Sequence, residues 1–181
     1  MKTISIKTIG FLFFLSFFSF LSCSESQDEV LTLIPEREKI VIEALPAGYQ
    51  TISQAKDIFP RVGSDIKYRH IDNEQIATIE TVVNIYESKQ SAATFSQAFS
   101  SLNEDLNKLC LTQSQIVNFC RKKSQHLCEG GPTFFLIKEN NEFFVIDVYS
   151  FANGLKVGAE SFDSKYALLD LSNYRIIVPE I

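Results

Sequence analysis

TFFLIKENNEFFVIDVYSF, residues 133–151, is the stretch of the chain that decides its fold. Two apolar runs, residues 133–138 and 143–151, flank the turn-forming residues 139–142, a pattern typical of a β-hairpin. The second run has no polar face, which indicates a central strand covered on both sides. Asp147 interrupts this run, and burying an unpaired carboxylate is costly. We therefore expect Asp147 at a partly wet or hydrogen-bonded position, with a structural role favoured over a place in a pocket.

Residues 88–109 carry the clearest helical pattern of the chain. Ser88 can cap a helix in which apolar residues recur at steps of 3, 4, 3, 4 and 3, and such spacing places them on one stripe. The stripe consists of Ala92, Phe95, Phe99, Leu102, Leu106 and Leu109. We expect one long amphipathic helix that packs these side chains on a sheet.

Weaker patterns suggest the remaining elements. The sequence TQSQ at residues 112–115 has the form of a capping box and predicts a second helix, which the GGP at residues 130–132 would end. Other apolar patterns predict strands at 40–44, 65–71, 75–86, 166–171 and 174–178, and short helices over 51–59 and 155–162. Residues 65–86 would form a hairpin that turns at 72–74.

The amino terminus, residues 1–22, has the form of an export signal. Two lysines precede an apolar run that is short of the ~20 residues of a bilayer span. Its end, FLSC at residues 20–23, resembles the lipobox of bacterial lipoproteins, in which a signal peptidase cuts before the cysteine after its sulfur has been acylated. The resemblance covers the first 23 residues. It implies a lipid such as palmitate on Cys23, so residues 23–30 would form an acidic, flexible tether. A transmembrane anchor or an ordinary secretory signal is the alternative.

The predicted elements together indicate a single α+β domain over residues 31–181, since about 150 residues is the usual size of one domain. We expect a mainly antiparallel sheet with the 88–109 helix and shorter helices packed on it. In outline this pattern resembles the small strand-helix sandwich domains of other bacterial lipoproteins and envelope sensor proteins, which bind rather than catalyse. The resemblance is one of pattern and involves no specific motif.

Charge narrows the range of partners. Residues 1–22 contain two of the 17 basic residues and none of the 22 acidic ones, so the mature chain would carry a formal charge of −7. Nucleic acid and anionic lipid surfaces both need a basic patch that neutralises phosphate. We therefore expect no nucleic-acid partner, and contact with the membrane through the lipid on Cys23.

Three cysteines, Cys110, Cys120 and Cys128, remain in the predicted domain. An odd number in an exported domain predicts one disulfide and one free thiol. A straight helix would separate Cys120 from Cys128 by ~12 Å of rise, which exceeds the ~7 Å limit between the Cα atoms of a disulfide. We favour Cys110 with Cys128, and Cys110 with Cys120 is a close alternative. Each local pair requires the helix after residue 112 to break.

Catalytic and metal chemistry find little support in the sequence. His126 and the three cysteines are spaced unlike any common zinc site, so we expect neither a metal nor a cofactor. A thiol-histidine hydrolase would need a cysteine beside His70 or His126, and His126 lies only two residues from Cys128. The usual phosphate-binding, dinucleotide-binding and hydrolase motifs are absent from the sequence.

The function predicted by these observations is that of a monomeric, non-catalytic protein anchored by lipid in the bacterial cell envelope. Its domain would bind an envelope protein or a small apolar ligand. Ser24 follows Cys23, whereas an aspartate there is the inner-membrane retention signal of the best-studied lipoprotein sorting systems, so the outer membrane is the favoured location. The alternatives are an envelope enzyme with a free cysteine, as a thiol hydrolase or in redox chemistry, and a Cys/His metal-binding domain.

Overall fold

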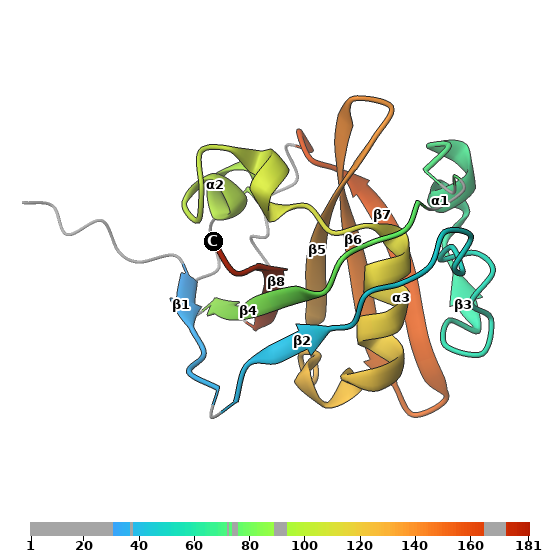
Figure 1. The fold of residues 1–181 in the computed structure, drawn as a ribbon, viewed down its shortest axis with the longest axis horizontal. Coiled ribbons are helices and arrows are strands. Elements are labelled where there is room, and N and C mark those ends of the chain that lie inside the picture. Colours follow the sequence, from blue (N-terminus) through green and yellow to red (C-terminus); the bar gives the residue numbers. More distant parts are fainter. Residues whose placement is uncertain (1–30, 37, 72, 74–75, 89–93, 165–172) are drawn as a thin grey trace, which may run out of the picture.

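The computed structural model describes residues 31–181 apart from residues 37, 72, 74–75, 89–93 and 165–172. Within this part of the chain eight strands form one mixed sheet in the order β1-β4-β8-β5-β6-β7-β3, and β2 also pairs with β4 (Figure 1). The strands are β1 (Leu31–Leu33), β2 (Ile40–Ile42), β3 (Arg61–Val62), β4 (Thr81–Ser88), β5 (Pro132–Glu139), β6 (Glu142–Phe151), β7 (Gly154–Ser161) and β8 (Tyr174–Pro179).

Short helices cover both faces of this sheet. Figure 1 shows α3 in front of β6 and β7, whereas α2 lies beside the end formed by β1, β4 and β8. The helices of the described residues are α1 (Ser64–Tyr68), α2 (Phe95–Ser100) and α3 (Gln113–Lys122), with 3-10 turns η1 (Leu106–Leu109) and η2 (Ser124–His126).

The predicted hairpin over residues 133–151 is confirmed. β5 and β6 pair from Pro132↔Tyr149 to Glu139↔Glu142 without interruption. The turn residues Asn140 and Asn141 have φ values of 52° and 63°, which asparagine tolerates better than most residues. β6 lies between β5 and β7, as predicted for a central strand.

Side chains of the hairpin alternate between two cores. Phe135 and Ile137 enter a first core under α3, while Phe134 and Leu136 enter a second core under α2 and η1. The first core also contains Ile40, Ile42, Ile52, Val83, Ile85, Ile116, Phe119, Cys120 and Val157. The second also contains Leu31, Phe95, Phe99, Leu109, Val145, Phe162, Tyr174, Ile176 and Val178.

The long helix predicted for residues 88–109 is wrong. Among the described residues of this segment only Phe95–Ser100 is α-helical, and η1 follows after a break. In the break the side chain of Asn103 accepts a hydrogen bond from the backbone N–H of Asp105 (2.8 Å), and the side chain of Asp105 accepts one from the backbone N–H of Asn107 (3.2 Å). Such local bonds compete with helical ones. The apolar stripe still faces inward, since Phe95, Phe99 and Leu109 are buried.

The predicted α+β class, with a mainly antiparallel sheet and one long helix, is therefore corrected. The structure is mostly sheet and its helices are short. The sheet is mixed because β8 inserts between β4 and β5 and runs parallel to β5, and because β3 runs parallel to β7. These neighbours are remote in sequence, so no local pattern specifies them.

Several shorter elements also differ from the predictions. Residues 65–71 contain α1 rather than a strand, and residues 155–162 lie mostly in β7 rather than in a helix. Residues 51–59 form hydrogen-bonded turns, although Ile52, Ala55 and Phe59 are buried as a helical stripe would be. The strand predicted at 166–171 lies outside the described residues.

The second predicted helix is confirmed in α3. Thr112 and Gln115 form the capping box: the Thr112 hydroxyl accepts from the Gln115 backbone N–H (3.2 Å), and the Gln115 side chain accepts from the Thr112 backbone N–H (2.9 Å). This cap satisfies two backbone donors. It fixes the start of the helix whose far end leads to His126 and Cys128.

Candidate functional site

The outer edge of β4 is paired with two separate strands, β1 and β2. Leu33 pairs with Tyr86 and Ile40 pairs with Val83, so seven residue steps on the edge chain lie opposite three on β4. Between these two pairs the edge chain therefore has four more residues than β4, a larger mismatch than that of an ordinary bulge. Bulges bend a sheet edge and are common beside binding and active sites. We call this region the split edge.

The split edge encloses a pocket of about 280 Å³, just below the ~300–1,000 Å³ usual for ligand pockets. Its floor belongs to the first core, because Ile40, Val83 and Ile85 are among the residues of that core. Its wall includes the partly buried Ile34. The lining residues are Leu33, Ile34, Pro35, Glu36, Glu38, Lys39, Ile40, Val82, Val83, Asn84, Ile85 and Glu180.

The rim of this pocket is charged. Lys39 Nζ lies 2.9 Å from a carboxylate oxygen of Glu180, so one acid of the rim is paired. Glu38 is exposed, and Glu36 contacts His126, with 3.3 Å between Oε1 and Nδ1. Three carboxylates and one ammonium thus surround an apolar floor.

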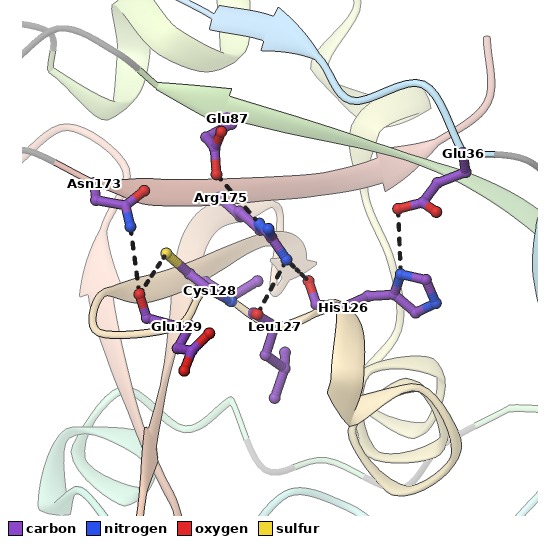
Figure 2. Close-up of polar contacts among 9 residues, drawn as sticks. Glu36, Glu87, His126, Leu127, Cys128, Glu129, Asn173 and Arg175 are labelled. Carbon is purple, nitrogen blue, oxygen red and sulfur yellow. Dashed lines mark hydrogen bonds and ion pairs between the residues drawn. The ribbon is translucent and has the colours of Figure 1, made fainter.

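The connection between α3 and β5 reaches the rim of the pocket through the contact of His126 with Glu36, as Figure 2 shows. Arg175 of β8 donates through Nη1 to the backbone oxygens of His126 (2.9 Å) and Leu127 (3.1 Å). Its Nε lies 3.6 Å from Oε1 of Glu87 on β4. Arg175 therefore joins this connection to two strands, and His126 extends from the same connection toward Glu36 at the rim.

The three cysteines of the domain are free thiols in the structure, so the expected disulfide is not formed between any of them. Cys120 lies in the first core and Cys110 packs against the second core, which places these two residues on opposite faces of the sheet. Cys128 follows η2 and donates its backbone N–H to Thr133 Oγ1 (2.7 Å).

Burial makes these thiols poor nucleophiles. It raises the pKa of Cys110 to about 12 and raises the pKa of Cys120 as well. Burial also raises the pKa of Cys128, which Arg175 partly offsets. Since the thiolate is the reactive form, none of the three is activated at neutral pH.

The histidines do not complete a catalytic pair with these thiols. In Figure 2 the imidazole of His126 points toward Glu36, on the other side of Arg175 from the Cys128 thiol. His70 is exposed and follows α1, with a φ of 52°. The cysteines and His126 also do not converge on a metal: among the described residues no three His, Cys, Asp or Glu side chains form such a group.

Asp147 is partly buried, as the sequence predicts. It lies opposite Gly158 of β7, where a Cβ atom would stand 2.5 Å from Oδ1 of Asp147, so the glycine leaves room for the carboxyl group. Burial, with smaller contributions from the nearby carboxylates of Asp65 and Glu160, raises the pKa of Asp147 to about 7.

Cys23, the predicted lipidation site, lies outside the described residues. A second hollow, of about 510 Å³, adjoins Phe143, Phe162 and Asp163. We take the split edge as the candidate site because its pocket combines an apolar floor from the first core with a charged rim.

Comparisons with protein-family models, curated proteins and solved structures found no match. In the described part of the chain no helix is long and apolar enough to cross a membrane.

Asp147 provides a test of the electrostatics. An unfolded aspartate titrates near pH ~3.9, so between about pH 4 and 7 the folded state binds more protons, and the free energy of unfolding falls as the pH rises. We expect the free energy of unfolding of wild type to fall by about 2–3 kcal/mol more than that of Asp147→Asn between about pH 4 and 7. Urea unfolding at a series of pH values measures this difference. Asp163→Asn, at an exposed carboxyl group, is the control, and equal pH profiles of wild type and Asp147→Asn would contradict the burial argument.

Proposed function

We propose that this chain is a lipid-anchored protein of the bacterial cell envelope whose domain binds a ligand without catalysing a reaction. The split-edge pocket is the observation that carries the binding half of this proposal. It combines an apolar floor with a small set of charged groups at its opening, which is the usual composition of a ligand site. The occupant is a small apolar ligand or an apolar side chain of a partner protein.

The charge of the rim narrows the chemistry of this occupant. Glu36, Glu38 and Glu180 face a single cation, Lys39, which is already paired with Glu180. An anionic group would meet two further carboxylates at the opening, and like charges at a partly desolvated site repel. The pocket therefore favours an apolar group that is neutral or positively charged.

A thiol enzyme is the less favoured function. Such an enzyme requires a thiolate and a base within hydrogen-bond reach of it. Cys110 and Cys128 have raised pKa values, and His126 is turned toward Glu36. These contacts stabilise the fold and do not activate a nucleophile.

The anchor follows from the sequence of the amino terminus. Eight residue steps separate Cys23 from Leu31, the first residue of β1, and an extended chain of that length reaches at most about 28 Å. A lipid on Cys23 would hold the split edge near the membrane surface, since Leu33 already lines the pocket. We further propose that the domain acts as a monomer, with the outer membrane as the favoured location.

The first test concerns the anchor. Cys23→Ser removes the sulfur that would carry the lipid, and stable attachment needs acyl chains. We expect wild type, but not Cys23→Ser, to incorporate a labelled fatty acid and to partition into the detergent phase. Ser26→Thr, which lies after the lipobox, serves as the control and retains label. Equal labelling of wild type and Cys23→Ser would show that the lipoprotein interpretation is wrong.

The second test concerns the pocket. We expect benzyltrimethylammonium to shift the amide resonances of Ile40 and Val83 in an NMR titration, and the similarly sized benzyl sulfonate to bind more weakly, because the rim is acidic. Glu38→Gln should weaken cation binding about two- to five-fold, the usual effect of one exposed charge. Glu104→Gln makes the same charge change at an exposed residue away from the pocket and should have no effect. Equal affinity for the two ions, or shifts confined to other regions, would exclude the proposed site.

A further inference from the structure

Part of the second face of the sheet is not covered by any helix of the described residues. The second core extends under α2 and η1 across β8 and β5 as far as Val145 of β6. Beyond it, Tyr149 and Phe151 continue the same face of β6, since alternate residues of a strand share a face. Tyr149 pairs with Lys156 of β7, which pairs with Arg61 of β3. We call Arg61, Asp147, Tyr149, Phe151 and Lys156 the open strip.

The aromatic rings of the open strip form a platform with cations at its borders. The Tyr149 and Phe151 rings are stacked, with centroids 6.3 Å apart and an angle of 25° between their planes. Arg61 Cζ lies 5.8 Å from the Phe151 centroid, and Lys156 Nζ lies 6.0 Å from the Tyr149 centroid. Phe151 is 47% exposed, so this platform remains accessible from solution.

The two cations of the open strip are available to a ligand. Arg69, Arg121, Lys122 and Arg175 form ion pairs with carboxylates, whereas neither Arg61 nor Lys156 lies within 4 Å of a described carboxylate. Both side chains are exposed. In a chain with an excess of acids, two unpaired cations beside two rings indicate a ligand that carries negative charge.

Two acids, Asp147 in the open strip and Glu160 beside it, restrict this ligand further. Asp147 lies one row from Tyr149 and Lys156, and Glu160 lies one row beyond on the same face of β7. A dense layer of phosphates, as on an anionic membrane, would be repelled by these carboxyl groups. A ligand with hydroxyl groups, spaced acids and flat apolar surfaces can contact the rings, the cations and the carboxyl groups of this region together. Its hydroxyl groups donate to the carboxylates, and its acids pair with the cations.

We propose that the open strip binds an acidic saccharide, a chain of sugar rings that carry carboxylates. The C–H faces of the rings pack on Tyr149 and Phe151 through dispersion contacts. Carboxylates of the sugar pair with Arg61 and Lys156, and its hydroxyl groups donate to Asp147. This site lies on the opposite face of the sheet from the first core that floors the split-edge pocket, so it does not depend on the function proposed for that pocket.

A short oligogalacturonate is a suitable probe, and its methyl ester is the matched control because it keeps the sugar rings and loses the charges. We expect calorimetry on the full chain, solubilised in detergent, to detect the acid and not the ester, with an affinity that falls as salt is added. Lys156→Gln and Arg61→Gln should each weaken binding about two- to five-fold, and Phe151→Ala about two- to ten-fold.

Lys56→Gln removes an exposed lysine outside the open strip and should leave the affinity unchanged. Circular dichroism establishes that each variant is folded. If Phe151→Ala is not folded, Phe151→Leu takes its place, because it keeps an apolar side chain and loses the ring. Three outcomes would overturn the proposal: equal binding of the acid and the ester, equal losses in Lys56→Gln and Lys156→Gln, or binding of anionic lipid vesicles in place of the saccharide.

Discussion

The burial of residues 132–137 of β5 and 144–146 of β6 on both faces of the sheet is the constraint on which the rest of the structure depends. Phe135 packs edge-on against Phe119 of α3, with ring centroids 5.7 Å apart. Its neighbour Phe134 points the other way and packs against Phe95 and Tyr174 at 5.1 and 5.6 Å. Each such ring contributes about 1.5–3 kcal/mol by burial. The short helices are held in place by the hairpin, because helices of their length are marginal in isolation.

The parts of the fold that local chemistry specifies could be predicted from the sequence. The hairpin is encoded by two apolar runs around a pair of asparagines, and α3 by the Thr112 and Gln115 capping box. The prediction of one helix over 88–109 was wrong because apolar periodicity does not register what Asn103 and Asp105 do. Their side chains accept hydrogen bonds from the backbone and interrupt the helix. The 155–162 segment is ambiguous in the same way: its apolar residues fit either a helix or the strand that forms.

The candidate site could not be predicted, because it arises from register and strand order. Only the pairing of both β1 and β2 with β4 shows that four residues are left over at the edge. In the sequence, Pro35 and the charged residues after it indicate that the apolar run at 30–34 ends before the run at 40–42 begins. The cysteines illustrate the same limit: their odd number suggested a disulfide, whereas the sheet separates Cys110 from Cys120.

The buried part of the hairpin should be the most stable region of the domain, and the split edge, which is joined to β4 by two strands of three residues each, should be less stable. Native-state hydrogen exchange at increasing urea concentrations tests this difference directly. The account predicts that the amides of Phe135 and Val145 exchange only through global unfolding, with a urea dependence equal to that of the whole domain. The amide of Ile34, bonded to the backbone oxygen of Ile85 at 2.8 Å, should exchange through a smaller opening with a weaker urea dependence. Local exchange of Phe135, or exchange of Ile34 only by global unfolding, would contradict the account.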